Sequence, residues 1–286
     1  MNWGAIVVAA GRGTRFGRPK QFVEIGGWPM VAWSLRTFES MPEIGELVVV
    51  TEEEWIEPMR TLLAQVAPSH NSSVVSGGTS RQSSVQRGLA QISDACGAVL
   101  VHDGARPLIR ADDVRCAMRA VRPGRAAVLA SAVVDTIKVV DSESMLVRRT
   151  LDRGELWAAQ TPQLAMRREL ERAHVAAQRA HLEATDDVAL LESIGIEVQI
   201  VPSSNENFKI THPQDVARAQ ALLSERAEHA PREEEILLVE VFADEATKEA
   251  HLRRADYRVP FFDEALAKPA LMNTAVPLEA LRTGSV

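Results

Sequence analysis

Residues 5–20 read AIVVAAGRGTRFGRPK, a strand-like run followed by a glycine-rich one. The run from Ala5 to Ala10 is apolar throughout, which is typical of a strand covered on both faces of a parallel sheet. Glycines follow it at once, at positions 11, 13 and 17. A Gly-rich turn after such a strand lets the backbone approach a phosphate chain closely, with peptide N–H groups directed at its oxygens. The stretch therefore predicts an α/β protein with a phosphate site at the end of its first strand.

The following 200 residues alternate between short strand-like runs and longer helical ones. Further strands are expected at Glu46–Thr51, Ala98–His102, Ala126–Val134 and Ile196–Val201. Helices are expected at Val31–Ser40, Glu53–Val66, Ser80–Ile92, Asp112–Val121, Met166–His181, Asp186–Ile194 and His212–Arg226. The last of these has a capping-box signal in Thr211-His-Pro-Gln214, with proline inside the first turn. The order predicts a Rossmann-like, doubly wound and mostly parallel sheet with right-handed crossovers.

Two segments depart from this alternation. Residues 132–156 contain VVDTIKVV, a DSES turn and MLVRRTL, which predicts a protruding β-hairpin arm. Its apolar strands have no helix to cover them and therefore favour a partner. After Arg226 a charged linker leads to a strand-like ILLVEVF, a helical Asp244–Ala255 and a Pro-punctuated end. We therefore divide the chain into a domain at 1–226 and a C-terminal extension at 227–286 to which no chemistry is assigned.

Composition excludes several classes of protein. The 286 residues are 46% hydrophobic and 25% charged, which is typical of globular chains. Their 32 basic and 39 acidic residues give a net charge of −7, which disfavours a broad basic face for nucleic acid. Cys96 and Cys116 form no CxxC pair, which argues against a disulfide scaffold or thiolate zinc site. No apolar run suggests a signal peptide or membrane span, so we expect a cytoplasmic protein without nucleic-acid or membrane partners.

The first Gly-rich loop carries the strongest chemical signal. Gly11 and Gly13 allow close backbone approach, and the cations Arg15 and Lys20 suit a triphosphate. The spacing G-x-G-x-x-x-G is one residue longer than the dinucleotide fingerprint, and the expected acidic residue about 20 positions on is missing. No Gly-Lys-Ser/Thr closes a P-loop. A Rossmann dehydrogenase is therefore a weaker hypothesis, which absence of NAD(P)H binding would exclude.

Other candidates follow later strands, where ligands of open α/β sheets bind. In VHDGARP, residues 101–107, Asp103 is a natural Mg²⁺ anchor, and an ion pair with Arg106 is the alternative. In GGTSRQSS, residues 77–84, glycines would admit a planar base whose edge Ser84 could bond. In NFKIT, residues 207–211, Lys209 is either an anion ligand or an ordinary surface lysine. We expect His102 to be structural.

Together these motifs resemble the 2-C-methyl-D-erythritol 4-phosphate cytidylyltransferases, over residues 3 to about 225. The pattern AAGxGxRxG…PKQ is shared with many sugar nucleotidyltransferases. VHDGARP, DRGELWAAQTPQ (152–163) and NFKIT are much more specific to the cytidylyltransferases. The resemblance implies transfer of CMP from CTP to methylerythritol phosphate, with release of pyrophosphate, in non-mevalonate isoprenoid synthesis.

The resemblance also implies roles for individual residues. Arg15 and Lys20 would be catalytic, stabilising charge on the triphosphate. CTP and Mg²⁺ would be held at Ala10, Gly11, Gly13, Gly78, Ser84 and Asp103, with Asp103 toward the metal. Arg153 and Lys209 would position the acceptor phosphate, with Thr136 and Thr185 as lesser candidates. In the family the arm embraces a second subunit, so Arg153 and Thr136 would act in the partner's site of a homodimer.

Some positions differ from the family pattern, and other functions stay open. Val8 stands where many members have proline, Thr79 where an acidic residue is common, and Gly104 where alanine is frequent. A ribitol 5-phosphate cytidylyltransferase would share the CTP machinery and differ in its acceptor pocket. A CTP-binding regulator without catalysis is a further alternative, disfavoured by the retained cations.

Overall fold

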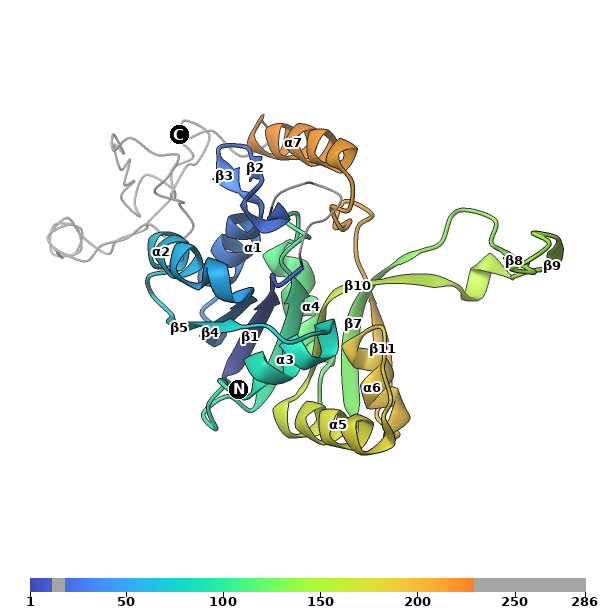
Figure 1. Cartoon of the computed structure of the whole chain (residues 1–286), viewed down its shortest axis with the longest axis horizontal. Coiled ribbons are helices and arrows are strands. Elements are labelled where there is room, and N and C mark those ends of the chain that lie inside the picture. The colour runs from blue at the N-terminus through green and yellow to red at the C-terminus, as the bar shows by residue number, and fades with distance from the viewer. Residues whose placement is uncertain (12–18, 229–286) are drawn as a thin grey trace, which may run out of the picture. The chain divides into compact units, whose positions relative to one another are not determined.

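The computed structural model describes residues 1–11 and 19–228, and these form a seven-stranded sheet with helices on both faces (Figure 1). The strand order is β11-β7-β10-β6-β1-β4-β5. Its strands are β1 (Trp3–Val8), β4 (Ile44–Thr51), β5 (Asn71–Ser76), β6 (Ala98–Asp103), β7 (Arg125–Ala132), β10 (Trp157–Met166) and β11 (Glu197–Pro202). All neighbours pair in parallel except β10, which runs antiparallel to both β6 and β7. The expected doubly wound, mostly parallel α/β sheet is confirmed.

Each face of the sheet is covered by its own set of helices. One face packs against α1 (Met30–Glu39), α2 (Ile56–Val66) and α4 (Ala111–Ala120). The other packs against α3 (Arg81–Leu89), α5 (Arg167–Ala180) and α6 (Asp187–Ser193). Residues that alternate along β1 enter different cores, Ala5 and Val7 on the first face and Ile6 on the second. The near-continuous apolar strands noted in the sequence are explained by this two-sided burial.

Two of the sheet strands lie outside the expected set. The edge strand β5 has the sequence NSSVVS and was not expected, because only its Val74 is fully buried. The inner strand β10 overlaps no expected strand, and the predicted arm ended where it begins. Its polar residues Gln160, Thr161 and Gln163 are buried and satisfied by bonds to other segments. The antiparallel insertion of β10 places residues 163–166 directly beside β6.

A third small core closes the end of the sheet where the site lies. The short segments η2 (Lys20–Phe22), β2 (Glu24–Ile25) and β3 (Trp28–Pro29) lead into α1, and α7 (Pro213–Glu228) packs on them through Ala219 and Ile25. The expected capping box of Thr211 and Gln214 is wrong. Instead, the carboxylate of Asp215 accepts the backbone N–H groups of Thr211 and His212, at 2.8 and 2.7 Å, and Pro213 opens the helix. Asp215 is the third residue of the helix and carries the negative charge that a helix N-terminus favours.

The arm projects away from the sheet between β7 and β10 (Figure 1). Its paired strands are β8 (Lys138–Val140) and β9 (Val147–Thr150), shorter than the sequence suggested, and η4 (Arg153–Glu155) leads back to the sheet. Several apolar side chains on it are exposed, including Met145 at 69% and Leu146 at 70%. The expected strand and helix beyond residue 228 lie outside the described residues.

Candidate functional site

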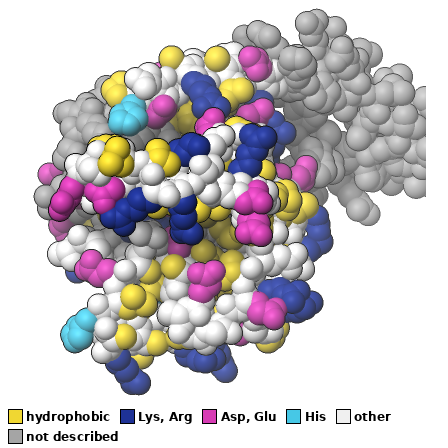
Figure 2. All heavy atoms as spheres, turned by 90° about the vertical axis from the view of Figure 1, so that its right-hand side faces the viewer, with side chains coloured by type: hydrophobic (Ala, Val, Ile, Leu, Met, Phe, Trp, Pro, Cys, Tyr) yellow, Lys and Arg dark blue, Asp and Glu magenta, His cyan; other side chains and the backbone are white. Residues whose placement is uncertain are grey.

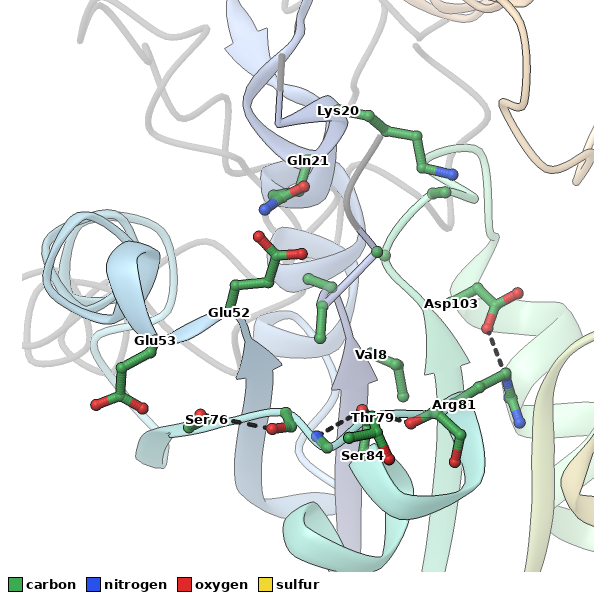
Figure 3. A pocket seen from close by; sticks show the side chains of 18 of the residues that line it. Val8, Lys20, Gln21, Glu52, Glu53, Ser76, Thr79, Arg81, Ser84 and Asp103 are labelled. Carbon is green, nitrogen blue, oxygen red and sulfur yellow. Dashed lines mark hydrogen bonds and ion pairs between the residues drawn. The ribbon is translucent and has the colours of Figure 1, made fainter. Parts of the chain in front are cut away.

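A pocket of about 920 Å³ opens at the carboxyl ends of β1, β4, β5 and β6 (Figure 3). This is the edge at which ligands of open α/β sheets bind. The described lining residues are Val8, Ala9, Ala10, Gly11, Lys20, Gln21, Glu52, Glu53, Glu54, Ser76, Gly77, Gly78, Thr79, Ser80, Arg81, Ser84, Asp103, Gly104, Ala105 and Lys209. Four separate segments that the sequence singled out are thus brought to one cavity.

One wall of the pocket follows β1. Ala10 and Gly11 line it, and beyond them Gly13 and Arg15 lie outside the described residues. Lys20 begins η2 and its Nζ donates to the carbonyl of Ile210 at 3.2 Å, which ties the lysine to the segment that carries Lys209. Two cationic side chains from distant parts of the chain therefore share one side of the cavity.

The opposite wall is the turn between β5 and α3. Gly78 N–H donates to Ser84 Oγ at 3.0 Å, and that hydroxyl donates to the carbonyl of Ser80 at 2.8 Å. A Cβ on Gly78 would lie 2.6 Å from Ser83 Cβ, so the turn has room only for glycine. Ser80 and Ser83 close a capping box at the start of α3. The result is a rigid wall of exposed backbone, suited to a planar base.

Asp103, the last residue of β6, lies between two cations. Its Oδ1 accepts Arg81 Nε at 3.1 Å and its Oδ2 accepts Lys209 Nζ at 2.8 Å. Burial by itself would raise the pKa of Asp103, but Arg81 and then Lys209 outweigh it and hold that pKa well below its usual range. Asp103 is therefore a carboxylate at neutral pH. The alternative loop ion pair with Arg106 is not formed, since Arg106 donates to the carbonyl of Asn207 at 2.6 Å.

A buried chain of hydrogen bonds fixes the backbone of Asp103 to Thr161 of β10 and to His102. Its backbone N–H donates to Thr161 Oγ1 at 3.0 Å, and Thr161 lies 3.1 Å from His102 Nδ1. The carbonyl of Arg106, 3.1 Å from His102 Nε2, can only accept, so a neutral ring carries its one proton on Nε2, and Nδ1 accepts the hydroxyl proton of Thr161. Burial lowers the pKa of His102 to about 4, so the ring is neutral. His102 supports the loop, as the sequence suggested.

The residues present could hold a magnesium ion only together with substrate phosphates and water, which would supply its other ligands. The described residues hold no group of three or more His, Cys, Asp or Glu side chains suited to a metal. Mg²⁺ is commonly bound by one or two carboxylates together with substrate phosphates and water. Asp103 offers one such carboxylate, and Lys209 would have to share or leave its Oδ2.

Three expected acceptor residues lie outside this pocket in their own chain. Thr136 and Arg153 belong to the projecting arm, where both are exposed and Arg153 Nη1 donates to the carbonyl of Val134 at 3.0 Å. Thr185 is exposed just before α6, next to Ala184, whose N–H bonds Gln82 of α3 at 3.1 Å. The structure thus brings Lys20 and Lys209 together with those nucleotide candidates that it describes, and separates the arm residues from them.

The chain matches the family model described as "IspD: 2-C-methyl-D-erythritol 4-phosphate cytidylyltransferase" over residues 4–225. The chain belongs to this cytidylyltransferase family. A cytidylyltransferase of that name from Halalkalibacterium halodurans is 40% identical over 79% of this chain and 99% of the relative. One from Salinibacter ruber is 43% identical over 76% of this chain and 91% of the relative.

Solved structures of the cytidylyltransferases share the fold. The 4-diphosphocytidyl-2C-methyl-D-erythritol synthase of Anaerococcus prevotii superposes with a TM-score of 0.70 at 28% identity, covering 78% of this chain and 98% of that one. The Thermus thermophilus cytidylyltransferase gives 0.63 at 33% identity, covering 78% and 100%. In the part of the chain that the structure describes, no helix is both long and apolar enough to cross a membrane.

Several residues at the cytidylyltransferase site were given no role from the sequence. Arg81 lines the pocket and contacts Asp103, and it pairs with the buried Asp187 at 2.8 Å. Thr161 supports Asp103 from β10. The position of Arg81 directly after a Gly-rich turn, and the paired acids at 186 and 187, were signals available in the sequence.

Proposed function

We propose that this chain transfers CMP from CTP to 2-C-methyl-D-erythritol 4-phosphate, giving 4-diphosphocytidyl-2-C-methyl-D-erythritol and pyrophosphate for isoprenoid synthesis. The observation that carries the proposal is the pocket itself. It unites Lys20, Asp103, Lys209 and the Gly78–Ser84 turn at one edge of the sheet, in a chain of this family.

The chemistry asks for positioning and charge neutralisation. An oxygen of the acceptor phosphate attacks the α-phosphorus of CTP, a new P–O bond forms, and the bond to the pyrophosphate leaving group breaks. The attacking group is already anionic, so no strong general base is needed. Two anions must meet, and cations that stabilise charge in the transition state supply most of the rate.

Lys20 and Lys209 are suited to different parts of that reaction. Lys20 stands on the side of the Gly-rich loop and would stabilise charge on the triphosphate. Lys209 stands beside Asp103, with its side chain 42% exposed, and would hold the acceptor phosphate. The link from Lys20 Nζ to the carbonyl of Ile210 keeps the two lysines in a fixed relation.

The nucleotide would lie against the Gly78–Ser84 turn. Glycine at 78 leaves the backbone open to the face or edge of cytosine, and Ser84 fixes that backbone. Ala10 and Gly11 would face the other side of the nucleotide. When bound, Mg²⁺ neutralises the triphosphate charge, and Asp103 is the described residue that would hold it.

We propose further that the catalytic unit is a homodimer formed through the arm. Exposed apolar strands are an association surface, and on the arm Met145, Leu146 and Val147 are 58–70% exposed. On the face that Figure 2 shows, basic and acidic side chains are interspersed and apolar ones lie between them, a surface without a broad basic area. Arg153 and Thr136 would then reach the partner's pocket.

The water-soluble substrates favour reaction in the cytoplasm.

Mixing two inactive variants tests the action of Arg153 in the partner's site. Lys20→Ala and Arg153→Ala each remove one half of a site. Random exchange of subunits places one intact site in half of the dimers, so activity should recover to about a quarter of wild type. Absence of recovery after verified exchange would place Arg153 outside the partner's site.

Pyrophosphate release tests the reaction itself. Purified chain with Mg²⁺ should release pyrophosphate only when CTP and methylerythritol 4-phosphate are both present. Lys20→Met should lower kcat strongly and leave the unfolding temperature almost unchanged, since the lysine acts on the transition state. A wild-type chain that binds CTP and releases no pyrophosphate would favour the regulator instead.

A further inference from the structure

The carboxylate of Asp187 is buried behind the pocket and is not used by the reaction proposed above. Asp187 is the first residue of α6 and is 1% exposed. Its Oδ2 pairs with Arg81 Nη1 at 2.8 Å. A charge so deeply buried is costly unless it is paired, and Arg81 is the partner that the structure gives it.

Arg81 connects this buried carboxylate to the one in the pocket. It is the first residue of α3, and its Nη1 contacts Asp187. Its Nε contacts Asp103 Oδ1 at 3.1 Å, as Figure 3 shows. A guanidinium offers donors in a fixed planar fork, so holding one side of it sets the direction of the other. The orientation of Arg81 toward Asp103 therefore depends on Asp187.

The charge of Arg81 is also divided between the two carboxylates. Burial works against its positive form, but Asp187 and Asp103 outweigh burial and raise the pKa of Arg81 further above its usual value. Arg81 begins a helix, where the helix dipole disfavours a cation. The two carboxylates therefore also have to offset the unfavourable interaction of the Arg81 charge with that dipole. Three cations, Arg81, Lys209 and Arg106, act on the single charge of Asp103. Asp187 is the second carboxylate that shares the charge of Arg81.

The neighbouring histidine does not replace Arg81 as the partner of Asp187. His174 Nε2 lies 3.9 Å from Asp187 Oδ1, and His174 is 3% exposed. Burial, and then the nearby Arg81, lower the pKa of His174 to about 4. It is therefore neutral at the pH of the reaction. Burial raises the pKa of Asp187 and Arg81 opposes that rise.

We propose that Asp187 is a positioning residue for the cytidylyltransferase reaction, acting through Arg81. It holds the guanidinium so that Arg81 aligns the carboxylate of Asp103 without neutralising it, and thereby keeps Asp103 available to the metal-bound nucleotide. The inference rests on the proposed function, and it adds a residue of the protein interior to the site.

Asp187→Asn tests the proposal, with Asp186→Asn as its matched control. Asp186 is the N-cap of the same helix: its Oδ1 accepts the N–H of Ala189 at 3.0 Å, a role that asparagine also fills, and its Oδ2 accepts Gln163 Nε2 at 3.0 Å. With Mg²⁺ present, calorimetric titration should show about a tenfold higher Kd for CTP in Asp187→Asn, the scale of one charged hydrogen bond. Asp186→Asn should stay within about threefold of wild type. A merely structural role would lower the unfolding temperature of Asp187→Asn and leave its Kd unchanged.

A double-mutant cycle shows whether the effect passes through Arg81. Arg81→Met leaves Asp187 buried and unpaired and should be poorly stable, whereas the Arg81→Met, Asp187→Asn double variant removes that charge and should regain stability. In the Arg81→Met background, adding Asp187→Asn should change the Kd less than about twofold. An equal effect of Asp187→Asn in both backgrounds would overturn the proposal. A Kd for CTP of Asp187→Asn equal to that of Asp186→Asn would overturn it too. A wild-type chain that binds no CTP would overturn the proposed function as well.

Discussion

Replacing Thr161 by valine removes one hydroxyl from beneath the site and keeps the shape of the side chain. That hydroxyl accepts Asp103 N–H at 3.0 Å and bonds His102 Nδ1 at 3.1 Å, and Thr161 itself is 4% exposed. Valine would leave both partners buried without a bond. Each unpaired buried group costs about 1–3 kcal/mol, so Thr161→Val should lower the free energy of unfolding by about 2–6 kcal/mol.

Thr161→Ser is the matched control, because it keeps the hydroxyl and loses only a buried methyl group. That loss should cost about 1 kcal/mol. For a domain of this size each kcal/mol moves the unfolding temperature by about 2–4 °C, so valine should unfold about 4–24 °C below wild type and serine only a few degrees below. Urea and thermal unfolding followed by circular dichroism measure both. Equal unfolding of the two variants would refute the hydrogen-bond chain from Asp103 to His102.

Three further predictions address pH, the acceptor and the nucleotide. Burial lowers the pKa of His102 and of His174 from 6.5 to about 4, so the folded protein binds fewer protons than the unfolded chain between these values. Stability should therefore fall as the pH falls from 6.5 to 4, by up to about 3 kcal/mol per histidine, and urea unfolding at constant free energy across this window would contradict the burial argument. Lys209→Met should raise KM for methylerythritol 4-phosphate at least tenfold and change KM for CTP less, whereas the reverse order would move Lys209 to the nucleotide. Gly78→Ala places a Cβ 2.6 Å from Ser83 Cβ and should raise KM for CTP about tenfold or more, which initial rates at varied CTP would show; an unchanged KM would remove that turn from the nucleotide site.

The parallel part of the fold could be predicted because its strands are apolar on both faces. The strand β10 could not, since Pro162 argues against an inner strand and Gln160 and Gln163 argue against a buried one. Both glutamines are satisfied by partners far along the chain: Gln160 accepts Asn207 Nδ2 at 2.9 Å and Gln163 bonds Asp186 at 3.0 Å. Such compensation is visible only once the neighbours of the strand are known.

The same division holds for the site. Gly78 and Asp103 could be predicted because each follows directly on a strand or a turn that has to reach the same edge of the sheet. The supporting pairs, Arg81 with Asp187 and His102 with Thr161, could not. Each joins segments whose proximity depends on the placement of β10 beside β6 and of α6 beside α3, and no local pattern encodes that placement.

Cytidylyl transfer by this chain is tested most directly by ³¹P NMR of the reaction of CTP and Mg²⁺ with one acceptor at a time. With methylerythritol 4-phosphate, we predict the signals of a new diphosphate diester and of pyrophosphate in equal amounts, and none with ribitol 5-phosphate under the same conditions. Formation of the diester from ribitol 5-phosphate in preference to methylerythritol 4-phosphate would contradict the acceptor assignment, and absence of any diester would contradict cytidylyl transfer by this chain.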